Sequence, residues 1–236
     1  MTHGAFWHFR SRTGRSLRPT LSAILLGLGP LLPLFTWAAE ENAAHHAFDD
    51  PATYSQSWDN AGRDAWQRPA ELVAALDVQP GMAVADIGTG TGYLLPHLSR
   101  AAGGSGRVFA VDISPAMLNW VQDRAKREGM NNVTTVVASG SATGLARSTV
   151  DRAIMINVWH HIEDPDAYAR DLHRVMREGA ILFIVEAHPE ADHRGGPPRH
   201  FRLPPETVVE QLERAGFRAK LDPFQIDRQY VVRAER

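Results

Sequence analysis

Cysteine is absent from the 236 residues of the chain. Its absence excludes disulfides, thiolate metal ligands, cysteine nucleophiles and an acylated N-terminal cysteine. An excess of positive charge is also missing, because 25 Lys and Arg residues face 27 Asp and Glu residues, which gives a formal net charge of -2. Without a basic field the chain has little to attract a phosphate backbone, so we expect no nucleic-acid partner.

Metal-ligand spacing is missing too, although the chain has 11 histidines. His45-His46 and His160-His161 are adjacent pairs rather than the spaced ligands of a helix or ribbon site, so we expect no metal. With 44% hydrophobic and 22% charged residues, the chain is long enough for one α/β domain with short appendages.

Acidic residues do not occur before Glu40. An apolar run, Leu21–Ala39, follows four arginines, Arg10, Arg12, Arg15 and Arg18. This pattern predicts that residues 1–38 are a secretory signal peptide with cleavage after Ala38, or a retained membrane anchor. We therefore expect an exported protein, periplasmic or anchored in the inner membrane, with possible membrane association through this segment. A cytoplasmic protein with a misassigned start is the alternative.

Strand and helix patterns alternate after this point, which predicts a parallel sheet with helices on both faces. The expected strands are Met82–Ile87, Val108–Val111, Val133–Ala138, Ala153–Ile156, Ile181–Val185, Phe217–Leu221 and Gln229–Ala234. The expected helices are Pro69–Leu76, Tyr93–Ala101, Pro115–Glu128, Pro165–Arg177 and Pro205–Ala215. Residues 39–68 are interpreted as a linker and lid segment, and residues 69–236 as the domain.

A glycine-rich turn, VADIGTGTGY, follows the first expected strand. Its glycines are spaced G-x-G-x-G, and Tyr93 stands where dinucleotide enzymes have a third glycine, which disfavours a nicotinamide dehydrogenase. The next strand ends in Asp112, whose carboxylate can accept both hydroxyls of a ribose. A tight turn with an unrelated N-cap aspartate remains the simpler alternative.

These motifs, with VFAVDISPAMLNWV and VDRAIMINVWHHIEDPDAYARDLHRVMREGAILFIVE, resemble the class I S-adenosylmethionine (SAM) dependent methyltransferases. The similarity covers Ala65–Ala234 and is strongest to the group of ubiquinone/menaquinone biosynthesis methyltransferases. It implies a Rossmann-like, doubly wound α/β fold with a seven-stranded, mostly parallel sheet of order 3-2-1-4-5-7-6, and SAM as the cofactor. Residues 59–69 also resemble a segment of exported relatives, which implies that this segment folds over the cofactor cleft.

The resemblance implies that Asp86 and Gly88–Gly92 hold the amino-acid end of SAM, and that Asp112 holds its ribose. The expected cofactor-binding residues are Asp86, Gly88, Thr89, Gly90, Gly92, Asp112, Ile113, Ser141 and Asn157. Ser141 stands where the family often has an aspartate that caps the adenine amino group, and a hydroxyl there has shorter reach and no charge.

Three candidate catalytic residues follow the fourth and fifth strands, at the edge where open α/β sheets bind ligands: His160, His161 and Glu186. Methyl transfer from a sulfonium mainly requires alignment, sometimes with proton removal by a base such as histidine. Each candidate also has a structural alternative, as a buried histidine, a helix cap or a solvated carboxylate.

The leading hypothesis is a SAM-dependent methyltransferase for an unidentified small-molecule or lipid-like acceptor. The expected export motivates the alternative, a non-catalytic ligand-binding protein of the cell envelope with the same fold, because SAM is made in the cytosol.

Overall fold

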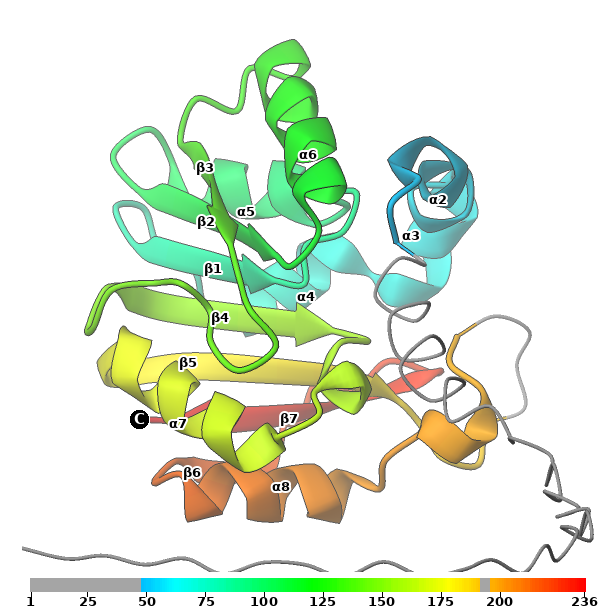
Figure 1. Cartoon of the computed structure of the whole chain (residues 1–236), viewed down its shortest axis with the longest axis vertical. Coiled ribbons are helices and arrows are strands. Elements are labelled where there is room, and N and C mark those ends of the chain that lie inside the picture. The colour runs from blue at the N-terminus through cyan, green and yellow to red at the C-terminus, as the bar shows by residue number, and fades with distance from the viewer. Residues whose placement is uncertain (1–47, 192–195) are drawn as a thin grey trace, which may run out of the picture. The chain divides into compact units, whose positions relative to one another are not determined.

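The computed structural model describes residues 48–191 and 196–236 (Figure 1). The expected targeting segment, 1–38, and the first part of the expected linker lie outside these ranges. Within them, no helix has the length and apolar character needed to cross a bilayer.

One seven-stranded sheet forms the centre of the domain. Its strands are β1 (Ala83–Ile87), β2 (Arg107–Asp112), β3 (Val133–Val137), β4 (Val150–Ile156), β5 (Met176–Ala187), β6 (Arg218–Leu221) and β7 (Gln229–Glu235). They lie in the order β3-β2-β1-β4-β5-β7-β6, and all neighbours are parallel except β7, which is antiparallel to β5 and β6. The predicted fold class and strand order are confirmed.

Helices cover both faces of this sheet. One apolar core joins it to α4 (Pro69–Ala75), α5 (Leu95–Ala102) and α6 (Pro115–Arg127). The other joins it to α7 (Pro165–Val175) and α8 (Pro205–Arg214). Successive strand residues point to opposite faces, so Val84 enters the first core and Ala85 the second. This alternation of buried side chains explains why the strands are nearly continuous apolar runs.

Helix starts follow local sequence signals. Ser114 caps α6 by accepting a hydrogen bond from the backbone N–H of Met117, and Asp164 caps α7 by accepting one from Ala167. Proline occupies the first turn in both helices, where a missing N–H costs nothing.

The boundary between α7 and β5 differs from the prediction. The helix ends at Val175, so its expected extension to Arg177 was wrong, and the strand begins at Met176 rather than Ile181. Met176 is fully buried and pairs with Val150 of β4. Pairing and burial therefore override a local sequence that is compatible with helix.

Two short helices precede the domain, α2 (Pro51–Trp58) and α3 (Ala61–Gln67). Figure 1 shows them beyond the carboxyl ends of β1 and β2. Asp50 caps α2 and Asn60 caps α3, each through its side-chain oxygen. We call residues 48–68 the strap. The sequence predicted a segment here but not its helices, although the two caps were a readable signal.

Two short 3-10 helices complete the described elements, η1 (Trp159–His161) after β4 and η2 (Arg199–Phe201) before α8.

Candidate functional site

The glycine turn joins β1 to α5 at the carboxyl edge of the sheet. Asp86, near the end of β1, is buried and accepts a hydrogen bond of 2.8 Å from the Thr89 hydroxyl. Burial raises the pKa of Asp86 to about 6, and the neighbouring Asp112 also raises it, whereas Thr89 and Arg63 lower it. A cation that approached this carboxylate would therefore favour its ionised form.

Asp112 ends β2 and fixes the same turn from the other side. Its Oδ2 accepts the backbone N–H of Gly90 at 2.8 Å, and its Oδ1 accepts that of Ser114 at 2.9 Å. Burial raises the pKa of Asp112, and the hydrogen bonds from backbone N–H groups counteract this. Both carboxylate oxygens are thus oriented by the backbone while each keeps a further acceptor site.

The three glycines of the turn all have positive φ, but their surroundings differ. A Cβ on Gly88 would lie 2.3 Å from Val158, and one on Gly92 would lie 2.7 Å from Leu95. A Cβ on Gly90 would instead lie 3.0 Å from the Trp58 ring of the strap. Gly88 and Gly92 therefore allow close packing within the domain, whereas Gly90 faces the strap.

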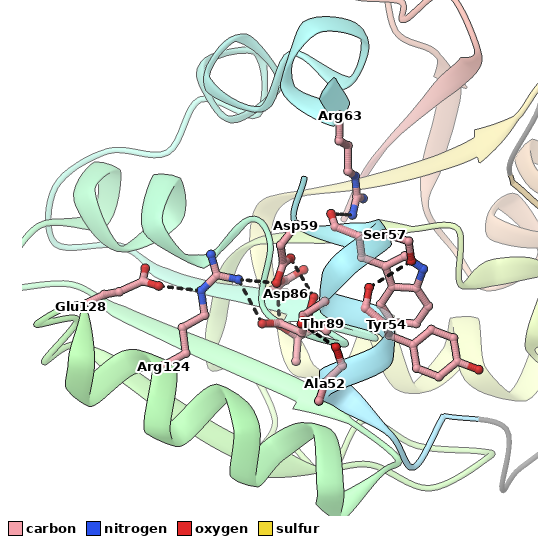
Figure 2. A network of polar contacts seen from close by, with 12 residues as sticks. Ala52, Tyr54, Ser57, Asp59, Arg63, Asp86, Thr89, Arg124 and Glu128 are labelled. Atoms are coloured by element: carbon pink, nitrogen blue, oxygen red, sulfur yellow. Dashed lines mark hydrogen bonds and ion pairs between the residues drawn. The ribbon is translucent and has the colours of Figure 1, made fainter. Parts of the chain in front are cut away.

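A polar network ties the strap to the glycine turn and to α6 (Figure 2). Asp59 accepts the Thr91 hydroxyl at 2.8 Å and pairs with Arg124 at 3.2 Å. Arg124 also donates to the Thr91 carbonyl at 3.1 Å and to Glu128 at 2.9 Å. Since both partners of the Asp59–Arg124 pair are largely buried, this pair is less screened than a surface ion pair.

Arg63 of α3 brings a cation to this edge. Its guanidinium lies 3.8 Å from the centre of the Tyr93 ring and donates to the Trp58 carbonyl at 2.9 Å. Partial burial lowers the Arg63 pKa, while Tyr93 and nearby acidic groups, including Asp86, raise it. The group stays charged, since guanidinium is not deprotonated in proteins. Arg63 was not among the residues predicted from the sequence, and its one signal was its place in the segment expected to cover the cleft.

Aromatic side chains of the strap extend from the glycine turn toward the other half of the edge. Tyr54 and Trp58 have ring centres 4.4 Å apart, and Phe48 lies 5.6 Å from the first and 6.0 Å from the second. Phe48 also contacts the His161 ring, at 5.8 Å. This aromatic cluster, Phe48, Tyr54 and Trp58, therefore connects the side of Gly90 with the side of His161.

The candidate catalytic residues form a second group. His160 Nδ1 lies 2.7 Å from Glu186 Oε2, and both side chains are almost fully buried. Glu186 Oε1 accepts the backbone N–H groups of Trp159, at 2.7 Å, and His160, at 3.4 Å. The His161 ring stacks beside His160 at 4.1 Å, and desolvation, with a smaller effect from His160, lowers the pKa of His161 to about 4. His161 is thus uncharged at neutral pH.

The remaining expected residues either lie apart from these groups or already have a hydrogen-bond partner within the protein. The side-chain oxygen of Asn157 accepts a hydrogen bond of 2.8 Å from the side-chain N–H of Gln229, and the side-chain oxygen of Gln229 accepts one of 2.5 Å from Gln67 of the strap. Ile113 follows Asp112 and is 44% exposed, so its apolar surface is available at the end of β2. Ser141 is exposed in a turn beyond β3, and it has no hydrogen bond to any other residue that the structure describes.

The geometry therefore brings Asp86, Thr89, Gly90 and Asp112 together beneath the strap, and His160 with Glu186 beside them. Among the residues that the structure describes, no three His, Asp or Glu side chains gather closely enough to hold a metal ion.

The chain is similar to known proteins over part of its length. Residues 85–184 match the model of a family described as methyltransferase domain (Methyltransf_11). These residues are therefore similar to a methyltransferase domain. The ubiquinone/menaquinone biosynthesis C-methyltransferase of Shewanella frigidimarina is 32% identical over 122 residues, which is 51% of this chain and 48% of that protein. The chain thus matches about half the length of such curated relatives.

Solved structures have a similar fold. A SAM-dependent methyltransferase from Aquifex aeolicus superposes with a TM-score of 0.72 and 28% identity, covering 78% of this chain and 97% of that one. A possible exported protein from Bordetella parapertussis superposes with a TM-score of 0.58 and 16% identity, covering 75% of this chain and 68% of that one. At that identity the second similarity concerns the fold alone.

Proposed function

We propose that the protein transfers the methyl group of SAM to a small-molecule or lipid-like acceptor. The observation that carries the proposal is the pair formed by Asp112 and the Gly90 turn. An oriented carboxylate stands at the end of β2, next to a glycine whose face is free of domain side chains. A ribose and an extended amino-acid chain need these two features side by side. The family match and the SAM-dependent relative from Aquifex aeolicus support the same cofactor.

The charges at the turn fit the two ends of the cofactor's amino acid. Asp86 is a buried carboxylate whose pKa is raised mainly by burial, and an ammonium group beside it would stabilise its ionised form. Arg63 could hold the carboxylate of the same amino acid, since a guanidinium binds carboxylates with two parallel hydrogen bonds. Asp112 would accept the ribose hydroxyls, and Ile113 offers an apolar surface for the adenine. Nothing comparable favours Ser141 or Asn157.

The strap would then act as the cover of the cofactor. Trp58 lies over Gly90, and Asp59 holds the strap to Thr91 and Arg124, so a bound amino-acid chain would lie between the strap and the turn. Enclosing the sulfonium excludes water from the reacting atoms and holds donor and acceptor in line.

Calorimetry with the full-length chain tests the cofactor assignment. SAM and S-adenosylhomocysteine should bind, and NAD should bind far more weakly. Tight NAD binding without SAM binding would overturn the proposal. Incubation with SAM labelled in its methyl group and an extract of cell metabolites and lipids then tests turnover. Label in an extracted compound supports an enzyme, and SAM binding without any transfer supports the non-catalytic ligand-binding protein instead.

We further propose that the chain is exported through its N-terminal segment, on the basis of the arginines before Leu21–Ala39. A reporter active only outside the cytoplasm should give signal when fused after residue 46. Mass spectrometry of the native protein should find a new N-terminus at Ala39 if the segment is cleaved, or an intact chain in the membrane fraction if it is an anchor. An intact chain in the cytosol with a silent reporter would contradict export.

A further inference from the structure

Arg63 of the strap is a partly buried cation without an acidic partner in direct contact. Its Nη1 donates to the Trp58 carbonyl at 2.9 Å, and its guanidinium packs on the Tyr93 ring, 3.8 Å from the ring centre. The acidic groups of the described residues act on it only from a distance. Because charges that leave water are normally paired, a guanidinium held in this way at the carboxyl edge of the sheet indicates an anionic group of a ligand.

A relay of three amide side chains runs from Arg63 to the sheet. The side-chain oxygen of Gln67 accepts a long hydrogen bond of 3.4 Å from Arg63 Nε. The Gln67 side-chain nitrogen donates to the side-chain oxygen of Gln229 at 2.5 Å, and the Gln229 nitrogen donates to that of Asn157 at 2.8 Å. Gln67 is 0% exposed and Gln229 is 1% exposed, so the centre of the relay is shielded from solvent. The relay thus joins α3 to β7 and to the end of β4.

The relay has one direction only. A guanidinium donates and never accepts, so Gln67 presents its oxygen to Arg63 and its nitrogen to Gln229. The same choice then fixes the amides of Gln229 and Asn157. Reversing one amide alone would place two donors or two acceptors against each other in buried surroundings, where an unsatisfied polar group is costly. The orientation of Arg63 is therefore linked to residues outside the glycine turn.

Asn157 anchors the far end of the relay. It follows β4, and its backbone N–H donates to the Val185 carbonyl of β5 at 2.9 Å. Its φ of 55° lies in the left-handed region, which asparagine adopts more readily than most residues. The relay is thus held by the sheet at one end, and at the other end it holds the strap residue Arg63.

Arg63 and Asp86 form a pair of opposite charges at the turn. Burial lowers the Arg63 pKa, and Tyr93, Asp59 and Asp86 counteract this. Burial also raises the pKa of Asp86, and Arg63 counteracts that. The two charges therefore act on each other. An α-amino acid carries its ammonium and carboxylate groups on one carbon, so its charges match such a pair.

We propose that the relay of Gln67, Gln229 and Asn157 positions Arg63 to bind the carboxylate of the cofactor's amino acid, and thereby gives the protein its selectivity for ligands that carry this group. This inference rests on the proposed SAM-dependent function. Arg63 is the residue that contacts the ligand, and the three amides are positioning residues that act through it. Since Nε and Nη1 of Arg63 already donate within the protein, the N–H groups of Nη2 remain for the carboxylate.

Decarboxylated SAM is the direct probe, because it keeps the sulfonium, the ribose and the ammonium group and lacks only the carboxylate. Calorimetry with the full-length chain should find it bound about 10- to 100-fold more weakly than SAM, as expected for loss of a charged hydrogen-bonded pair. Arg63→Met should weaken SAM binding by a similar factor and leave the affinity for decarboxylated SAM nearly unchanged. Equal affinities of the parent protein for the two ligands would overturn the inference without any variant.

Gln67→Glu tests the relay while keeping its hydrogen bonds. The new carboxylate can pair with Arg63, and the amides of Gln229 and Asn157 can both turn to match it, so the fold should persist. Arg63 then has a counterion within the protein, and the preference for SAM over decarboxylated SAM should fall by at least about tenfold. Gln56→Glu is the matched control, because it adds the same charge at an exposed position of the strap outside the relay and should leave the preference unchanged.

Gln229→Leu and Asn157→Gly test the remote end of the relay. Glycine tolerates the left-handed backbone at residue 157, so the second variant removes the amide without adding backbone strain. Each variant should reduce the preference for SAM by about three- to tenfold, the effect of a neutral hydrogen bond. In an Arg63→Met background neither should change the preference further, because the amides act through Arg63. Thermal unfolding controls for the fold of each variant.

The outcomes separate this inference from the proposed function. Losses of equal size for SAM and decarboxylated SAM in Arg63→Met or Gln67→Glu, as a merely structural role would give, would overturn the inference while SAM binding persists. An undiminished preference for SAM in both Gln229→Leu and Asn157→Gly would overturn the positioning role. Failure of the parent protein to bind SAM would instead overturn the proposed function itself.

Discussion

The backbone N–H of Gly90 donates a 2.8 Å hydrogen bond to the carboxylate of Asp112, across the ends of two neighbouring strands. A single side chain thereby sets the shape of the glycine turn, and its oxygens keep further acceptor sites. Positive φ at Gly90 makes this possible, because the turn brings its N–H to the end of β2.

Replacement of Asp112 should separate these two roles. We expect Asp112→Ala to weaken SAM binding by about 1–3 kcal/mol, since the ribose hydroxyls and the Gly90 N–H both lose an acceptor. Asp112→Asn keeps one carbonyl oxygen and should lose less. Calorimetry measures both affinities, and circular dichroism controls for folding. Parental affinity in both variants would show that the ribose lies elsewhere.

Cofactor binding should depend on pH through Asp86. Because burial raises its pKa to about 6, the free protein binds a proton there as the pH falls from 7 to 5. A bound ammonium group favours the ionised carboxylate, so the affinity should fall with pH, approaching roughly tenfold per unit below pH 6. Asp112 has a raised pKa and acts in the same direction, whereas the Arg63 cation opposes protonation of Asp86.

The free energy of unfolding of the protein without cofactor should change with pH in the opposite direction. Folded Asp86 binds protons more tightly than the unfolded chain, whose reference pKa is 3.8. Its contribution to the free energy of unfolding should therefore increase as the pH falls from about 7 toward 4. Asp86→Asn should remove this contribution and flatten the pH dependence of SAM affinity. Affinity independent of pH in the parent protein would argue against an ammonium beside Asp86.

The glycines of the turn should respond differently to substitution. Gly88→Ala places a methyl group against Val158 and strains a residue with φ of 69°, so we expect a loss of about 1–3 kcal/mol in unfolding free energy. Gly90→Val meets the Trp58 ring instead and should abolish SAM binding. Its stability loss should be smaller, because the ring can shift with the strap.

Thermal unfolding and calorimetry on the two glycine variants give both quantities. Gly129→Ala is a control for positive φ alone, since its Cβ would meet no atom within 4 Å. If Gly90→Val bound SAM like the parent, the face of Gly90 would not be the cofactor surface.

The strap should control the rate of cofactor exchange. Asp59→Ala removes its links to Thr91 and Arg124, and we expect faster SAM dissociation with a loss of about 1 kcal/mol in affinity. Stopped-flow fluorescence of the tryptophans, with Trp58 over Gly90 as the reporting ring, measures the rate. Glu128→Ala breaks only the outer contact of Arg124 and serves as the control. Equal dissociation rates in Asp59→Ala and the parent would contradict the covering role.

The sequence predicted the sheet because its strands are nearly continuous apolar runs separated by helical patterns, and the pairing order followed from the family resemblance. Asp86, Thr89, Gly90 and Asp112 were predicted together because they lie at the ends of two strands that the fold makes neighbours. The hydrogen bond between His160 and Glu186 could not be predicted from the sequence, because 26 residues separate them and only the pairing of β4 with β5 brings them together. Arg63 and Asp59 were missed for the same reason, because their contacts depend on how the strap packs.

A crystal structure of the full-length chain with S-adenosylhomocysteine tests the central claim most directly. The ribose hydroxyls should lie within hydrogen-bond distance of Asp112, and the amino-acid chain should pass Gly90 beneath Trp58, with its ammonium group toward Asp86. The ligand bound away from the ends of β1 and β2, or with its ribose out of reach of Asp112, would contradict the account.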